Sequence, residues 1–139
     1  MKIKHRLLSL LAAVTILSSF ATQSVHAAEV DGPAVIGALF YSDTCGSCKV
    51  LDPKITAARE TMADSPVLFV TFDHSNEATK NQAILLADRL GLEEIYASQK
   101  KASGFLLLID AKTGEVIETI TKSASAADIE ASLAKAIQS

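Results

Sequence analysis

After residue 34, short apolar runs alternate with longer segments in which apolar residues recur at helical spacing. The runs 35–41 and 67–72 contain no charge and are rich in β-branched and aromatic residues, which predicts two buried strands. The segments 45–62 and 79–90 show the helical pattern, and Gly91 is placed to end the second helix. The apolar face of that helix would consist of Ala83, Ile84, Ala87 and Leu90. This order predicts helices that cross between parallel strands.

The C-terminal third begins with a different pattern. Two apolar runs, 105–109 and 116–120, flank the turn-forming sequence Asp-Ala-Lys-Thr-Gly at 110–114, which predicts an antiparallel hairpin. The segment 92–103 has no clear period and is compatible with a short helix followed by a loop. The sheet should therefore be mixed, with parallel early strands and an antiparallel edge.

An amphipathic helix is predicted to close the chain. Ser125 can cap its start, with Asp128 at the capping-box spacing. Its apolar face would contain Ile129, Leu133 and Ile137. No internal repeat or low-complexity linker interrupts the series of elements. We therefore expect one α/β domain with a mixed central sheet flanked by helices.

Residues 1–27 have the three parts of a secretory signal peptide. A basic start precedes an apolar run at 7–17, and small residues at Val25 and Ala27 suit signal peptidase. The run is well short of the roughly 20 residues that a membrane-spanning helix needs, which disfavours the alternative of an uncleaved anchor. We therefore predict a signal peptide at 1–27, cleavage near Ala27, and a mature domain at 28–139 that is periplasmic or secreted.

The charge balance argues against one class of partner. The whole chain has a net charge of −3, and removal of residues 1–27, which hold three Lys or Arg and no acid, leaves 10 basic and 16 acidic residues, or −6. No basic stripe interrupts this composition, so we expect no nucleic-acid partner. The remaining 112 residues suit a single compact domain, which we expect to be monomeric.

The two cysteines of the chain stand two residues apart in Cys45-Gly46-Ser47-Cys48, between the first predicted strand and the first predicted helix. In an oxidising compartment, such a pair is a redox centre, a metal clip or a structural disulfide. A structural disulfide would gain little, because closing so short a loop contributes about 2 kcal/mol, against about 3 kcal/mol for a 15-residue loop. The pattern therefore favours a redox centre.

The two thiols would occupy different places in the predicted first helix. Cys45 would lie at its N-terminus, where unpaired N–H groups lower the pKa of the thiol. Cys48 would lie about one turn deeper and be shielded by that turn. We therefore predict that Cys45 attacks a substrate disulfide and that Cys48 resolves the mixed disulfide.

Three features around this pair resemble the thioredoxin family. The sequence 39–49, Leu-Phe-Tyr-Ser-Asp-Thr-Cys-Gly-Ser-Cys-Lys, is similar to the family's strand, loop and active-site motif. Pro53 matches the proline of the family's first helix, and 114–116 resembles its late hairpin turn. The similarity covers residues 33–138 and implies a thioredoxin-like fold. It also implies a thiol–disulfide oxidoreductase of either direction, which acts on protein thiols and disulfides with no cofactor and with a membrane or periplasmic redox partner.

This chain departs from the family pattern at three places. Thr44 replaces the tryptophan that usually precedes the first cysteine, and Leu39 replaces a buried aspartate that helps to deprotonate the second. Ser103-Gly104 stands where the family has a cis-proline that faces the disulfide and shapes the substrate groove. The resemblance therefore assigns Ser103 and Gly104 to this groove, with backbone groups of Gly104 available to a substrate strand.

The missing proline leaves an alternative function open. In the family this proline discourages metal binding at the thiols, so Cys45 and Cys48 could here hold copper, as Cu(I), or another soft metal. His74 is the one histidine after the predicted cleavage site, and it would follow the second strand at the same end of the sheet. It is the candidate third ligand. The competing interpretation is that His74 is a loop residue with a solvated ring.

Overall fold

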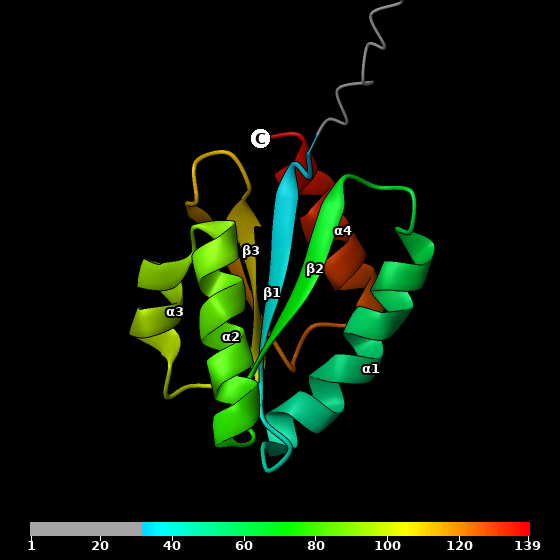
Figure 1. Cartoon of the computed structure of the whole chain (residues 1–139). Coiled ribbons are helices and arrows are strands. Elements are labelled where there is room, and N and C mark those ends of the chain that lie inside the picture. Colours follow the sequence, from blue (N-terminus) through cyan, green and yellow to red (C-terminus); the bar gives the residue numbers. More distant parts are fainter. Residues whose placement is uncertain (1–31) are drawn as a thin grey trace, which may run out of the picture. The chain divides into compact units, whose positions relative to one another are not determined.

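The computed structural model describes residues 32–139, and the predicted signal peptide with its cleavage site lies outside this range. The predicted order of strands and helices is confirmed, and the ambiguous segment after the second helix contains a short helix (Figure 1). The elements are β1 (Val35–Tyr41), α1 (Gly46–Thr61), β2 (Val67–Asp73), α2 (Glu77–Leu90), α3 (Glu93–Gln99), β3 (Phe105–Asp110), β4 (Val116–Thr121) and α4 (Ala126–Ile137). Within this range, no helix has the length and apolar character needed to cross a membrane.

The four strands form one mixed sheet in the order β2-β1-β3-β4. β1 runs parallel to β2, with Val35 opposite Val67, and antiparallel to β3, with Phe40 opposite Phe105. β3 and β4 form the predicted antiparallel hairpin, with an irregular register between Leu108 and Ile109. The central position of β1 places its C-terminal end, where the cysteine motif begins, in the middle of the sheet.

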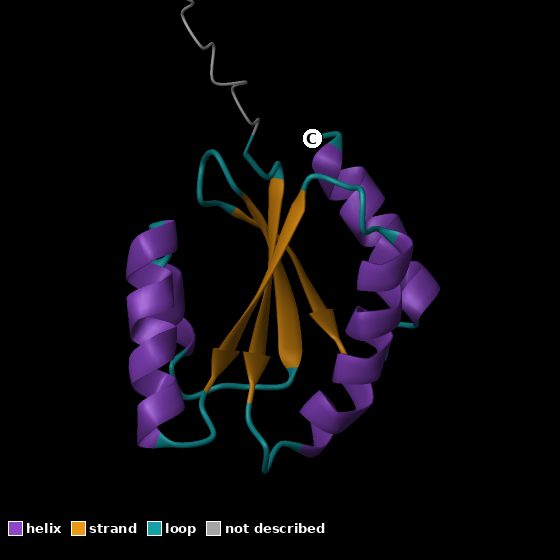
Figure 2. Ribbon diagram, turned by 45° about the vertical axis from the view of Figure 1, so that its right-hand side comes forward, coloured by secondary structure: helices purple, strands orange, loops and turns teal. Residues whose placement is uncertain are grey.

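Helices cover both faces of the sheet, with α1 and α4 on one face and α2 and α3 on the other (Figure 2). Alternate residues of β1 point to opposite faces and so join two separate cores. The aliphatic core lies against α1 and α4 and consists of Val35, Leu39, Leu51, Ile55, Ala58, Leu106, Leu108, Ile120, Ile129, Leu133 and Ala136. The aromatic core lies against α2 and α3 and consists of Ile36, Ala38, Phe40, Phe72, Ala83, Ala87, Leu92, Tyr96, Leu107 and Ile109.

Side-chain caps fix where two of these helices begin. The predicted capping box of α4 is confirmed, because Ser125 accepts a hydrogen bond from the Asp128 N–H and Asp128 in turn accepts one from the Ser125 N–H. α2 has an equivalent box between Asn76 and Thr79, which the sequence analysis did not identify. Gly91 ends α2 as predicted, in the left-handed conformation with φ of 67°.

Two details of the predicted core are wrong. β2 was expected to be a buried strand, but it lies at the edge of the sheet, where Phe72 is its one fully buried side chain and Leu68 is exposed. Ile84 was placed on the apolar face of α2, but 51% of its surface is exposed. Successive helical residues are about 100° apart, so Ile84 cannot share the line of Ala83 and Ala87 that faces the sheet.

Candidate active site

A tight turn leads from β1 into α1 and sets the position of Cys45. The Cys45 N–H donates to the carbonyl of Ser42 at 3.1 Å, which closes the turn. The Asp43 N–H donates to the Ser75 hydroxyl at 2.9 Å, so the turn is also tied to the loop after β2. Cys45 is in an extended conformation and is the N-cap of α1, which begins at the next residue. The sulfur of Cys45 therefore lies at the helix terminus, as predicted.

The N-cap position makes Cys45 a hydrogen-bond acceptor. The Cys48 N–H donates to the Cys45 Sγ at 3.3 Å. Partial burial alone would raise the pKa of the Cys45 thiol, but hydrogen bonds from the Cys48 thiol, the Ser103 hydroxyl and the first N–H groups of the helix outweigh it. The pKa of Cys45 is therefore lowered, and the thiolate becomes the stable form closer to neutral pH.

Cys48 has the opposite environment. Its side chain is fully buried, and its thiol points toward the Phe40 carbonyl, with 3.8 Å between sulfur and oxygen. Burial and the neighbouring Cys45 together raise the pKa of Cys48 above its ordinary value. Both cysteines are free thiols in this structure, so the geometry is that of the reduced pair. Cys45 is thus a half-buried thiol with a lowered pKa, and Cys48 is a fully buried thiol with a raised one.

The structure brings Ser103 and Gly104 against the two thiols. Ser103 lies beside the two sulfurs, and its side chain lowers the pKa of each. Gly104 has φ of 94°, and its N–H donates to the Phe40 carbonyl at 2.8 Å. A Cβ atom at this position would lie 2.7 Å from the Cβ of Ser47 and 3.1 Å from the Cys45 Sγ. Glycine is therefore required here both by conformation and by the closeness of the thiol.

The main chain of Phe40 is the functional group that sequence analysis missed. Its carbonyl accepts from the Gly104 N–H and lies next to the Cys48 thiol, so one oxygen links β1, the loop before β3 and the buried sulfur. No side-chain pattern could have indicated it, because the contact depends on the pairing of β1 with β3. Leu39 is buried in the aliphatic core, and residues 32–139 contain no buried charged side chain that could take a proton from Cys48.

His74 is half-buried, and its ring is not fully solvated as the competing interpretation expected. Its ring makes edge contacts with Phe40 and Tyr96, at centroid distances of 5.9 Å and 5.4 Å. Its Nε2 is buried without a hydrogen-bond partner. Burial lowers the pKa of His74, against a smaller opposite effect of the Ala102 carbonyl. Across residues 32–139, no three His, Cys, Asp or Glu side chains are grouped to hold a metal, so the structure does not join His74 to the two thiols as ligands.

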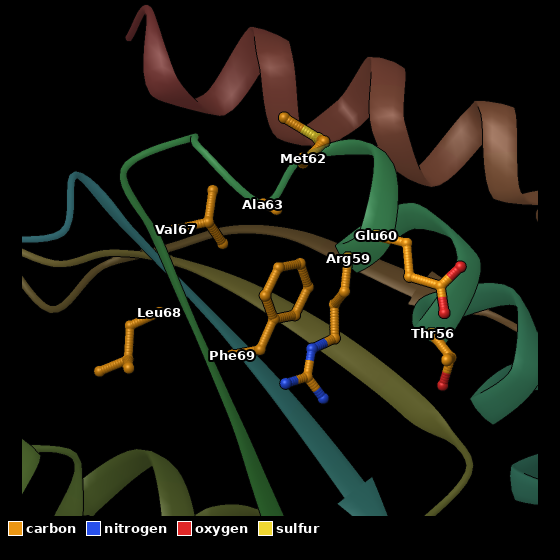
Figure 3. Close-up of a pocket in the computed structure, with 8 residues that line it drawn as sticks. All are labelled: Thr56, Arg59, Glu60, Met62, Ala63, Val67, Leu68 and Phe69. Carbon is orange, nitrogen blue, oxygen red and sulfur yellow. The ribbon is translucent and has the colours of Figure 1, made fainter.

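A separate pocket of the described domain contains neither thiol. It has a volume of about 660 Å³ and lies between the C-terminal half of α1 and the edge strand β2 (Figure 3). Its wall includes Arg59, whose guanidinium carbon is 5.4 Å from the centre of the Phe69 ring. Thr56, the residue of this wall nearest to the motif in sequence, is two helical turns beyond Cys48. The site chemistry is therefore confined to the other end of α1.

Comparison with known proteins agrees with this geometry. The family model described as Thioredoxin matches residues 19–87, a span that includes β1, both thiols and most of α2. No curated protein matches the chain.

Two solved structures share the fold at low sequence identity. A thiol:disulfide interchange protein of the thioredoxin family from Chlorobium tepidum TLS is 17% identical, with a TM-score of 0.52, over 74% of this chain and 79% of its own. StoA from Bacillus subtilis is 17% identical, with a TM-score of 0.51, over 73% of this chain and 84% of its own. The predicted fold class is thereby confirmed. With the family model matched across the paired thiols, these findings show that the chain belongs to the thioredoxin family.

Proposed function

We propose that this protein is exported and exchanges disulfides with protein substrates, with Cys45 as the nucleophile and Cys48 as the resolving thiol. Its family makes it a thiol–disulfide oxidoreductase. The observation that carries the assignment of roles is the contrast between the two sulfurs. Cys45 is accessible and has a lowered pKa, whereas Cys48 is fully buried and has a raised one.

In the reducing direction, the reaction has two steps. The Cys45 thiolate attacks one sulfur of a substrate disulfide, so a mixed disulfide forms and the other substrate sulfur leaves as a thiolate. The Cys48 thiol then loses its proton to that departing thiolate and attacks Cys45. The protein disulfide forms, the second substrate sulfur leaves and takes up a proton from solvent, and the substrate has gained two electrons.

The direction in the cell depends on the partner that restores the starting state. A membrane or periplasmic dithiol would return the protein to the reduced form, whereas a disulfide-generating partner would make it an oxidant. The predicted signal peptide at 1–27 supports action in an oxidising compartment. N-terminal sequencing of the exported protein tests this part of the proposal, and a first residue near Ala28 is the expected result.

Reduction of insulin by dithiothreitol tests the exchange activity. The wild-type protein should accelerate the reaction, and Cys45→Ser should reduce the rate to the uncatalysed background. Cys48→Ser should instead trap a mixed disulfide between Cys45 and the substrate, which mass spectrometry detects. Wild-type protein that gives no acceleration, while remaining folded by circular dichroism, would contradict the proposal.

A further inference from the structure

A basic pocket adjoins the redox centre. It has a volume of about 420 Å³, and its lining includes Lys80, Lys100 and Lys101 together with His74. The lining also includes Ser42, Thr44 and Ser103, which belong to the turn before Cys45 and to the loop beside its sulfur. A group bound in this pocket would therefore lie beside a disulfide presented to Cys45.

The charge in this pocket is unusual for the protein. Residues 32–139 contain 10 Lys and Arg against 14 Asp and Glu, yet three lysines line this pocket and no acid does. Lys80 forms an ion pair with the exposed carboxylate of Glu77 at 2.7 Å, whereas Lys100 and Lys101 form none within residues 32–139. Gathering like charges is unfavourable unless an anion offsets them, so this wall is suited to a negatively charged ligand.

Uncharged polar side chains complete the lining of this pocket. Ser42, Thr44 and Ser103 contribute hydroxyl groups, which can donate hydrogen bonds to a carboxylate. The pocket therefore combines cationic side chains with hydrogen-bond donors, and no acidic side chain lines it.

The pocket continues into an apolar groove. A neighbouring pocket shares the three lysines and adds Ile84, Tyr96 and Glu77, the ion-pair partner of Lys80. Beyond it, a groove of about 540 Å³ is lined by α2 and α3, the helices that lie side by side in Figure 1. Its lining includes Ile84 and Leu85, whose exposed fractions are 51% and 66%, and also the acids Asp88 and Glu93. Lysines without a partner acid in the lining thus occur only in the part of this surface that adjoins the thiols, and the exposed apolar side chains lie further along α2. A small anion would use the basic part alone, whereas a polypeptide can contact both parts.

We propose that the basic pocket binds the carboxylates of a polypeptide substrate next to the disulfide that Cys45 attacks, and that the groove between α2 and α3 accepts an apolar side chain further along the same segment. This inference rests on the proposed function and names its substrate class. Ile84 lies one helical turn, or about 6 Å, beyond Lys80 along α2. An extended segment covers that distance in about two residues. The preferred substrate therefore has acidic residues next to its cysteine, and an apolar residue about two positions beyond them on the same side.

Short peptides that differ only beside one internal disulfide test this inference. The two residues next to the attacked cysteine are Asp-Glu, Asn-Gln or Lys-Lys, placed after it in one set of peptides and before it in a second set. The value of kcat/KM is measured with dithiothreitol as the reductant. The wild-type protein should prefer the acidic over the amide peptide by about tenfold at low salt, with the lysine peptide slowest, because charge complementarity raises the rate of encounter. The preference should shrink as salt is added.

Charge reversal locates the effect. The double substitution Lys100→Glu and Lys101→Glu should abolish or invert the preference for the acidic peptide. A matched double substitution, Lys112→Glu and Lys135→Glu, makes the same change in net charge away from this pocket and should retain the preference. An equal loss in both variants would mean that overall charge, and not this pocket, selects the substrate, and the inference would be wrong.

The remaining arms separate the possible failures. Equal rates for all peptides would overturn the inference and leave the oxidoreductase function standing, whereas no reduction of any peptide would overturn both. If the protein prefers glutathione disulfide over its ethyl ester by about tenfold, as it prefers the acidic peptide, the pocket would select a small anion and not a polypeptide.

The apolar groove is tested with a second change in the peptide, in which the later apolar residue is Leu or Ser. The wild-type protein should reduce the Ser peptide a few-fold more slowly than the Leu peptide, whereas Leu85→Ser should reduce both at the same rate. Val116→Ser, a substitution at an exposed residue away from the groove, should behave as the wild type.

Discussion

The two faces of the sheet contribute differently to this molecule. The face under α1 and α4 is packed with aliphatic side chains, and the helix that starts at the reactive cysteine lies on it. The face under α2 and α3 is packed around Phe40, Phe72 and Tyr96, and it carries the lysines and the exposed apolar groove. The chemistry of the thiols thus belongs to one face, and the surface that we propose for recognition belongs to the other.

A single strand connects the two faces. The side chain of Phe40 packs in the aromatic core, while its carbonyl contacts the Cys48 thiol and accepts the Gly104 N–H. Substitutions in α2 and α3 should therefore change which substrates are preferred without changing the reactivity of the thiols, provided that β1 and the loop before β3 are not displaced.

Gly104→Ala should have the largest effect, because it acts where the two faces meet. The added Cβ would meet Ser47 at 2.7 Å, and the positive φ of 94° disfavours any side chain. Displacement of reacting groups by about 1 Å can cost 10²-fold in rate, so we expect disulfide exchange to fall by at least about tenfold. The insulin assay measures the loss. Gly32→Ala, at a glycine with no neighbour within 4 Å, is the control and should retain full activity.

Ser103→Ala should have an intermediate effect that is confined to the thiols. Its hydroxyl lowers the pKa of Cys45, so its removal should shift the pH profile of Cys45 alkylation by iodoacetamide toward higher pH. At neutral pH the rate should then fall a few-fold. The control Ser132→Ala, in α4, removes a hydroxyl that donates to Glu118 of β4 and should leave the profile unchanged. A profile unaffected by Ser103→Ala would contradict this effect of Ser103 on the Cys45 thiol.

The same pKa shifts predict how the stability of the reduced protein depends on pH. The pKa of Cys45 is lowered in the folded state, so its contribution is present above the unfolded pKa and is lost as the pH falls through the folded one. The pKa of Cys48 is raised, so its contribution is present below the unfolded pKa and is lost as the pH rises through the folded one. Urea unfolding of the reduced protein across this range, with Cys45→Ser and Cys48→Ser as references, measures the two contributions separately.

The helix caps should give the smallest effect and the sharpest comparison. Asn76→Ala and Ser125→Ala each remove one capping box and should each lower the free energy of unfolding by about 1 kcal/mol. Asn76 begins the helix that carries Lys80, so its substitution should also weaken the preference for acidic peptides. Ser125 begins α4 on the other face, and its substitution should leave that preference intact. The same response from both variants would mean that the faces are not independent.

The elements that sequence predicted correctly are those specified by local signals. β1 is an uninterrupted apolar run, and the start of α4 is marked by Ser125 and Asp128 within four residues. The edge position of β2 could not be inferred in this way, because strand order depends on the pairing of β1 with the distant β3. Ile84 was misplaced because helical spacing alone did not show which side of α2 meets the sheet.

The candidate site shows the same division between local and distant information. The spacing and position of Cys45 and Cys48 predicted their opposite environments, because both effects arise within one helical turn. The environment of His74 could not be predicted, since its neighbours Phe40 and Tyr96 come from separate elements. The basic pocket was missed for a related reason. Lys80 and Lys100 are 20 residues apart and belong to different elements, so their spacing in the sequence does not indicate that they line one pocket.

The N-cap role of Cys45 couples the oxidation state of the protein to the stability of its first helix. A thiolate accepts the Cys48 N–H and is favoured by the partial positive charge of the helix terminus, whereas a disulfide sulfur carries no charge. By a thermodynamic cycle, any free energy that favours the folded reduced form over the folded oxidised form makes the pair a stronger oxidant. The difference in the free energy of unfolding between the reduced and the oxidised protein therefore reports the reduction potential of the pair. A difference of about 1.4 kcal/mol corresponds to about 30 mV.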